Sequence, residues 1–277
     1  MTTESNLETR WSPGLSANRI FAMILRYAYL LKDSWPRIVE MVYWPTVQLL
    51  MWGFISKYLA SATNLFAQTF GLFLSAVLLW DVLFRGQLGV SLSFFEEMWS
   101  RNLGHLMVSP LRPSEFIAAL LTMSLVRTLI GMVPASFLTI WFFGYSVYGL
   151  GLSLIVFFIN LIVMGWAFGI AVSGLVLRWG LGAESLAWAL VFAIAPLCGI
   201  YYPLDVLPGW LLPVAQAIPA SYVFEGMRSI MLENTVRWDL MLTAVTLNLF
   251  YLAAGVGLFF WYFGAARRRG TLLQLGE

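Results

Sequence analysis

Repeated apolar runs are the feature that most constrains this sequence. A helix needs about 20 consecutive apolar residues to cross a bilayer, and several runs reach or approach that length. Of the 277 residues, 60% are hydrophobic and 11% charged, against roughly 25% charged in a soluble domain. The sequence therefore predicts an all-α membrane protein with about six transmembrane helices. The runs cover residues 39–60, 65–92, 114–143, 152–177, 184–200 and 240–263.

Residues 15–34 predict an amphipathic helix ahead of the first span. Arg19, Arg26 and Asp33 recur every seven residues and share one face. Such a helix would lie in the membrane interface with its basic residues near anionic headgroups; the alternative is a helix packed on its own protein. We therefore divide the chain into residues 1–38, a cytoplasmic tail with this interface helix, and a transmembrane domain, residues 39–277. The opposite, apolar face holds Ile20, Ile24, Tyr27 and Leu31.

The basic residues predict the orientation of the chain. The start of the sequence lacks the features of a cleaved signal peptide, so we expect the N-terminus to stay in the cytoplasm. The C-terminus falls on the same side. On this topology the outer side holds Lys57, Arg228 and Arg237, whereas the inner side holds Arg10, Arg19, Arg26, Lys32, Arg37, Arg101, Arg112, Arg178 and Arg267 to Arg269.

Residues 91–116 form the densest charge cluster and predict a cytoplasmic elbow between the second and third spans. Phe94, Phe95, Met98 and Leu103 would bury against neighbouring helices, while the charged residues would point to the cytosol or to a partner. Two prolines break the helix before Ser114, which we expect to cap the third span. The alternative is a loop that is only solvated. The charged residues are Glu96, Glu97, Arg101, His105, Arg112 and Glu115.

Three charged residues fall inside predicted spans. Asp81 and Arg85 are four residues apart on one helical face, so they can pair. Arg127 lies near the middle of the third span, where an arginine must face protein, water or an anion, and Asp81 is one candidate partner. These residues either stabilise the pathway, bind an anionic group, or serve packing alone.

Residues 201–238 are too rich in proline for one spanning helix. Short apolar pieces between prolines predict re-entrant or interfacial helices before the last span, on the outer side. Aromatic residues here fit the belt at a membrane surface. The residues that mark this segment are Tyr201, Tyr202, Pro203, Pro208, Trp210 and Arg228.

Nothing in the sequence predicts catalysis. His105 is the sole histidine, so a metal site built on several His ligands within one chain is excluded, and neither Lys32 nor Lys57 follows a glycine as a phosphate-binding loop requires. Cys198 lies in an apolar run and is expected to serve packing. We therefore predict no catalytic residue, no metal, no cofactor in this chain and no nucleic-acid partner. If transport uses ATP, another polypeptide must bind it.

Two segments resemble the permease subunits of type-2 ABC exporters, a family that exports drugs, oligosaccharides and polysaccharides. The stretch EEMWSRNLGHLMVSPLRPSEF is similar to the family's acidic–Leu–Pro–Leu–x–x–x–Glu segment after the second span. The stretch GIYYPLDVLPGWLLPVAQAIPASYVFEGMR resembles its G–x–x–x–P–x–x–x–x–P–x–W pattern, which ends in an arginine. His105 and Val108 depart from the commoner residues at their positions.

The resemblance implies a homodimer, or a pair of related permeases, on two copies of an ATP-binding ABC subunit that holds ATP and Mg. It implies that the elbow enters a groove of the ATPase as a coupling helix, that the N-terminal helix touches the same subunit, and that the short helices cap the outer side. The expected contact residues are Glu96, Glu97, Arg101, His105, Arg112, Arg19 and Arg26.

The function predicted is thus the permease of an ATP-driven exporter that moves an amphiphilic substrate outward through the membrane, such as a lipid-linked glycan, a polysaccharide or a drug-like molecule. A lipid-modifying membrane enzyme is one alternative, but it would need acidic, His or Lys groups clustered at one membrane face. A secondary transporter is another, and it usually shows repeated halves. The sequence shows neither pattern.

Overall fold

The structure, a computed structural model, describes residues 16–62 and 70–269. The predicted tail before residue 16, including Arg10, and the start of the second span before residue 70 lie outside the described residues. The longer helices are α2 (Ala17–Lys32), α3 (Trp35–Ala62), α5 (Phe70–Trp99), α7 (Pro113–Phe143), α8 (Leu152–Trp179), α11 (Pro219–Glu233) and α12 (Trp238–Arg269). The shorter ones are α6 (Leu103–Val108), η1 (Val147–Leu150), η2 (Leu181–Ala183), α9 (Ser185–Ile194), η3 (Ala195–Leu197), η4 (Leu204–Val206) and α10 (Leu212–Gln216).

The described residues form helices and connecting turns without a strand, which confirms the all-α prediction. In this part of the chain, 5 helices are long and apolar enough to cross a membrane: α3, α5, α7, α8 and α12. The predicted span at residues 184–200 is shorter. Its helix α9 has 10 residues, about 15 Å at the rise of an α-helix, and the chain then tightens into η3 at Pro196.

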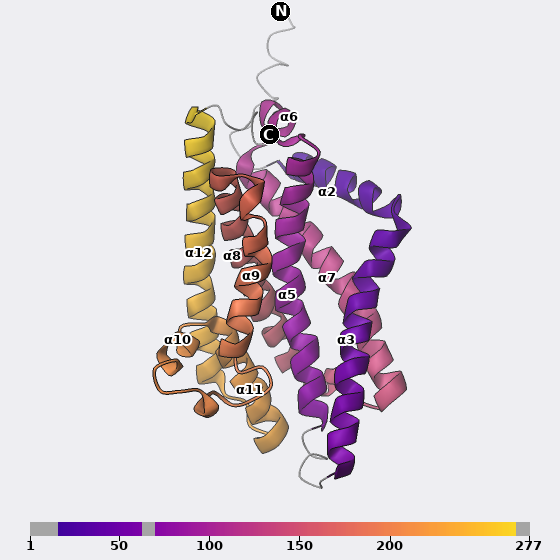
Figure 1. The fold of residues 1–277 in the computed structure, drawn as a ribbon. Coiled ribbons are helices and arrows are strands. Elements are labelled where there is room, and N and C mark those ends of the chain that lie inside the picture. Colours follow the sequence, from indigo (N-terminus) through magenta and orange to yellow (C-terminus); the bar gives the residue numbers. More distant parts are fainter. Residues whose placement is uncertain (1–15, 63–69, 270–277) are drawn as a thin grey trace, which may run out of the picture.

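Helix α5 is the centre of the bundle. It packs against α8, α7 and α3, while α12 packs along the far side of α8 (Figure 1). Glycines let the backbones approach closely: a Cβ at Gly165 of α8 would lie 2.7 Å from the carbonyl oxygen of Leu83 on α5. Likewise, a Cβ at Gly255 of α12 would lie 2.5 Å from the carbonyl oxygen of Ala167. Small residues at such crossings are typical of packing between membrane helices, so α5, α8 and α12 form one tightly packed block.

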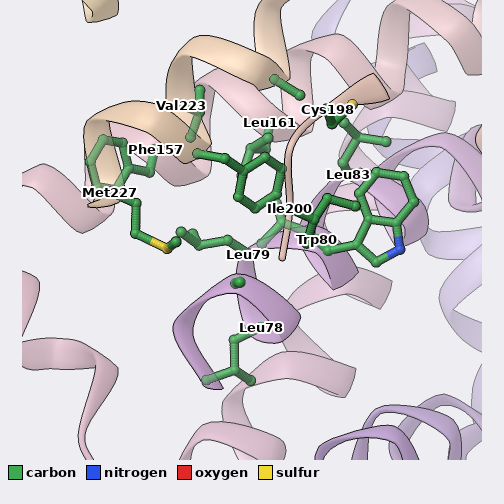
Figure 2. Close-up of a cluster of buried hydrophobic side chains, with 14 of the residues drawn as sticks. Leu78, Leu79, Trp80, Leu83, Phe157, Leu161, Cys198, Ile200, Val223 and Met227 are labelled. Carbon is green, nitrogen blue, oxygen red and sulfur yellow. The ribbon is translucent and has the colours of Figure 1, made fainter. Parts of the chain in front are cut away.

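Two clusters of buried apolar side chains lie at opposite ends of this block. One surrounds the junction of α2, α5 and α7 and is rich in aromatic residues, among them Tyr27, Phe94 and Phe116. The other joins α5 and α8 to the segment after α9 and to α11 (Figure 2). Cys198 is buried in this second cluster as a free thiol, in agreement with a packing role.

The two ends of the bundle differ in their elements. Helices α2 and α6 lie at the end where α12 finishes, whereas α10 and α11 lie toward the opposite end (Figure 1). The end with α6 is referred to below as the elbow end. The basic residues follow the same division. Arg101, Arg112, Arg178 and Arg267 belong to the elbow end, while Arg237 precedes α12 at the other.

Candidate functional site

The elbow, residues 91–116, consists of the last turns of α5, the short helix α6 and the start of α7. Helix α5 continues to Trp99, beyond the predicted end of the second span at residue 92. It ends in a left-handed residue, Arg101, with φ of 54°. The amide of Asn102 donates to the carbonyl of Glu97 at 2.9 Å, and that of Arg101 to the carbonyl of Met98 at 3.0 Å. This hydrogen-bond pair is a Schellman motif, in which glycine is the usual left-handed residue.

The start of α7 differs from the prediction. Arg112, not Ser114, occupies the N-cap, because Pro113 begins the helix and lacks the amide that an interior position would need. Glu115 then reaches back, and its Oε2 accepts a hydrogen bond from the Arg112 amide at 3.0 Å. Leu111 is buried, so the burial of its side chain and the hydrogen bond of Glu115 together stabilise the corner between α6 and α7.

Glu115 also joins the elbow to α2. Its carboxylate accepts two hydrogen bonds from the Arg19 guanidinium, from Nη2 at 2.7 Å and from Nε at 2.8 Å. The amide of Ser16, just before α2, donates to Oε1 at 2.8 Å. Hydrogen bonding to Glu115 raises the pKa of Arg19. A single carboxylate thus lies at the first turn of both α2 and α7, where the helix dipole favours negative charge.

Glu97 makes the second connection between α5 and α2. Its side chain is 2% exposed, and its Oε1 lies 2.9 Å from Nη1 of Arg26. Its Oε2 accepts hydrogen bonds from Nη2 of Arg26 at 3.0 Å and from Nδ2 of Asn102 at 2.7 Å. Tyr27 is fully buried beside it; burial raises the pKa of the phenol, and the Glu97 carboxylate adds to that rise. We call the pairs Arg19–Glu115 and Arg26–Glu97 the arginine latch.

The latch corrects two predictions about these residues. Glu97 does not point to the cytosol or to a partner, because its carboxylate is buried against Arg26. Arg19 and Arg26 hold carboxylates of the elbow instead of facing lipid headgroups. The seven-residue spacing did place them on one face. What the sequence could not show is which charged group, about 70–100 residues away along the chain, meets that face.

The apolar faces of α2 also differ from the prediction. Tyr27 and Leu31, assigned to the membrane-facing side, are both buried, and Tyr27 packs in the apolar cluster that includes the elbow. A second stripe, Phe21, Leu25 and Tyr29, is exposed at intervals of four residues. Helix α2 is therefore packed on its own protein through one apolar face and presents another to the outside. For the face that holds Tyr27, the alternative of a helix packed on its own protein is therefore correct, and the interfacial placement is not.

The exposed surface of the elbow consists of a few side chains, some basic and some apolar. Arg101 and His105 are exposed, Arg112 is half-buried, and Val108 at the tip of the corner is 84% exposed. Trp99 is exposed too, and its Nε1 donates to Oε2 of Glu184 at 3.1 Å, which ties the end of α5 to the α8–α9 turn. These side chains, held on a latched base, are the part of the elbow that another protein could contact.

The sequence predicted only some of the ion pairs that the charged residues inside the spans form. Asp81 and Arg85 form the expected ion pair. Arg127 does not meet Asp81; its Nη2 lies 3.3 Å from Glu96, which also lies 3.4 Å from Nη1 of Arg37. Glu96 is therefore half-buried between α3 and α7 instead of pointing to the cytosol. Arg37 was missed as a site residue, because nothing in its local sequence indicates a partner on α5.

The segment before α11 is held by Arg228. Its Nη2 donates to the carbonyl of Gly199 at 2.6 Å and to Glu225 at 2.9 Å, while Glu225 accepts from the Leu204 amide at 2.9 Å. This fixes the turn that carries Tyr201, whose ring stacks on Trp52 of α3 at 4.5 Å between centroids. Sequence reasoning missed Trp52 and Glu225.

The other residues that were predicted to mark this segment do not take part in the stacking of Tyr201 on Trp52. Tyr202 donates a hydrogen bond to the Pro196 carbonyl, and Pro203, Pro208 and Trp210 are exposed. The helices η4, α10 and α11, of 3, 5 and 15 residues, replace a spanning helix here, in agreement with the proline spacing.

The spanning helices make the chain a multi-pass helical membrane protein. Among residues 16–62 and 70–269, no group of three or more His, Cys, Asp or Glu side chains is placed to hold a metal ion. Its residues 23–232 match the family model described as ABC-2 type transporter. Because this match covers more than half of the sequence, the chain belongs to the ABC-2 type transporter family. None of the curated proteins compared with the chain matches it.

Membership confirms the resemblance found in the sequence. The family consists of membrane components of ABC transporters, typically permeases that catalyse no reaction themselves, and it implies a partner ATP-binding ABC subunit. The match extends from within α2 to the last turn of α11, and thus includes the Arg26–Glu97 pair, the elbow with Glu115, and the Arg228 turn, while Arg19 precedes it.

Proposed function

We propose that this chain is the permease subunit of an ATP-driven exporter, and that its ATPase docks on the exposed surface of the elbow. Two copies of that ATPase would bind ATP and Mg, and two copies of the permease would enclose the path between them. The cargo would be an amphiphile that moves outward across the cytoplasmic membrane of a bacterium, either a lipid-linked glycan, a polysaccharide or a drug-like molecule.

The arginine latch is the observation that carries the proposal. A loop that is only solvated needs no buried ion pairs, because water satisfies its charges. Here Glu97 and Glu115 are buried and bonded to arginines of a separate helix. The latch makes α2 and the elbow one stiff unit joined directly to α5 and α7, so a force applied at Arg101, His105 or Val108 would reach the spanning helices.

The distribution of charge supports the orientation. The elbow end carries most of the arginines, which fits the positive-inside rule for the cytoplasmic face. Both described termini of the helical bundle, Ser16 and Arg269, belong to elements that reach this end (Figure 1). An ATPase in the cytoplasm would therefore meet α6 and the exposed side of α2 first.

Co-purification of the full-length chain from its native membrane tests the proposal. We expect an ATP-binding subunit in equal amount, and we expect Arg101→Glu to weaken that association and reduce ATP-driven export. Arg178→Glu is the matched control, since it reverses an exposed arginine at the end of α8, outside the elbow. Full transport by the chain without any ATPase would refute the proposal, and unchanged association of the Arg101→Glu variant would refute the docking surface.

A further inference from the structure

A row of charged side chains lies between α3, α5 and α7, within the helices of spanning length. We call Arg37, Asp81, Arg85, Glu96 and Arg127 the charged seam. Asp81 and Arg85 pair on α5. Glu96, farther along α5, lies 3.3 Å from Arg127 of α7 and 3.4 Å from Arg37 of α3. Three helices thus contribute charges to the seam, in two groups: the Asp81–Arg85 pair, and Glu96 with its two arginines.

Gly131 shows that Arg85 of α5 lies against the part of α7 that carries Arg127. Gly131 lies one helical turn beyond Arg127, on the same face. A Cβ at Gly131 would lie 3.0 Å from Nη1 of Arg85 and 2.8 Å from the Met41 carbonyl oxygen of α3. The Arg85 guanidinium therefore occupies space that any larger residue at position 131 would fill.

The seam carries more positive charge and more donors than its own carboxylates use. Its three arginines face two carboxylates, an excess of one positive charge. A guanidinium has five N–H donors, yet Arg127 makes one hydrogen bond, to Glu96, and its buried Nε has no partner among the described residues. The side chains of Arg85 and Arg127 are 14% and 11% exposed. Unpaired donors and net charge are costly inside a membrane, so a bound anion would stabilise this arrangement.

The surroundings of the seam favour an anion that carries an apolar chain. Exposed apolar side chains flank it on both outer helices, Trp44 and Val47 on α3 and Val126, Leu129 and Val133 on α7. A free inorganic ion would have to leave water to reach this depth. An amphiphile would place its apolar chain along these side chains and only its headgroup at the arginines.

We propose that the charged seam binds the oxyanion headgroup of an anionic amphiphile, with Arg85 and Arg127 as its ligands. A phosphodiester or a carboxylate supplies one negative charge and two acceptor oxygens, which match the excess charge and the unused donors. The proposal rests on the proposed function in one respect: if the chain is an exporter permease, the inference names the chemical class of its cargo, or of a lipid that accompanies it.

Lipid binding to the full-length chain in a neutral maltoside detergent tests the seam without the ATPase. The probes are lysophosphatidylglycerol, a phosphodiester with net negative charge, and lysophosphatidylcholine with the same acyl chain. Titration calorimetry should show the anionic lipid binding about tenfold tighter or more. Arg127→Gln should remove that preference, whereas Arg178→Gln, outside the seam, should keep it. Inorganic phosphate should not compete.

Two further variants keep the test decisive if a charge deletion destabilises the protein. Gly131→Ala retains every charge but displaces the Arg85 guanidinium and presses on the α3 backbone at Met41, and it should weaken anionic-lipid binding about severalfold. Arg127→Lys retains the charge with a different donor geometry and should bind at an intermediate strength. Equal binding of both lipids, or a preference that survives Arg127→Gln and Gly131→Ala together, would overturn the inference. Displacement by inorganic phosphate would overturn the amphiphile as the ligand.

The exporter proposal and the charged-seam proposal can be refuted independently of each other. A chain that binds anionic lysolipid selectively but recruits no ATPase would refute the exporter and retain the seam. A chain that recruits its ATPase and exports with unchanged binding in the seam variants would refute the seam and retain the exporter.

Discussion

The interaction between Arg26 and Glu97 gives a quantitative test of the latch. Glu97→Gln keeps the shape of the side chain but replaces one carboxylate oxygen by an NH2 group. Nη2 of Arg26 and Nδ2 of Asn102 both donate to Oε2 of Glu97, so the new amide can keep its oxygen there. Its NH2 group then replaces Oε1, which lies 2.9 Å from Nη1 of Arg26. The substitution therefore sets two N–H donors against each other at Nη1 of Arg26 and removes the negative charge that this guanidinium faces.

The magnitude follows from burial and from the type of bond. A hydrogen bond to a charged group contributes about 1.5–3 kcal/mol. Glu97 is 2% exposed, but Arg26 is 36% exposed, so solvent screens part of its attraction. We therefore expect Glu97→Gln to lower the free energy of unfolding by about 2 kcal/mol. A double-mutant cycle with Arg26→Gln should give a coupling energy of about 1 kcal/mol.

Tryptophan fluorescence during denaturation of the purified chain in mild detergent measures these values. Arg237→Gln is the control, because it removes an exposed ion pair with Asp239 at the opposite end of the bundle and should change stability little. In the complex with the ATPase, loosening α2 should reduce export more than ATP hydrolysis. A coupling energy near zero would refute the latch as a stabilising contact, and equal losses of hydrolysis and export would refute its role in coupling.

Three other substitutions test separate contacts. Arg101→Gly should raise the free energy of unfolding by about 1 kcal/mol, because glycine adopts the left-handed conformation without strain. The same variant should associate less with the ATPase. Denaturation measures the first effect and co-purification the second. Gly165→Ala should destabilise by about 1–3 kcal/mol, since its Cβ would meet the α5 backbone, whereas Gly257→Ala, with open space around it, should not. A double-mutant cycle of Trp52→Ala and Tyr201→Ala should give a coupling of about 0.5–1.5 kcal/mol if the rings stack as observed.

Local patterns predicted the elements well because they depend on nearby residues. The length of each apolar run gave the spanning helices to within a few residues at most ends. The four-residue spacing gave the Asp81–Arg85 pair, since one helix fixes the distance between these side chains. The exception was the run at residues 184–200. Its composition resembles the others, but Pro196 ends the regular helix after Ile194.

Partners from different helices could not be predicted, because composition fixes neither the rotation nor the tilt of a helix. Asp81 was one candidate partner for Arg127, which instead meets Glu96, near the end of α5. Glu115 lies in the first turn of α7, where its own helix favours a carboxylate, but its bond to Arg19 spans 96 residues of sequence. A charged residue in an apolar segment therefore indicated that a partner exists without indicating which one.

The contacts of α3 show how the two ends of the molecule are connected. Only 17% of the residues in its apolar stretch are buried, against 83% in α5, so α3 is attached to the bundle by fewer contacts along its length. Yet it is held at two places, near its start through Arg37 to Glu96 beside the elbow and in its second half through Trp52 to Tyr201 at the Arg228 turn. Because α5 is packed tightly against α8, a displacement of the elbow is resisted along α5 and meets less resistance along α3. Under the proposed function, α3 is therefore the helix that would carry movement from the ATPase side to the outer segment.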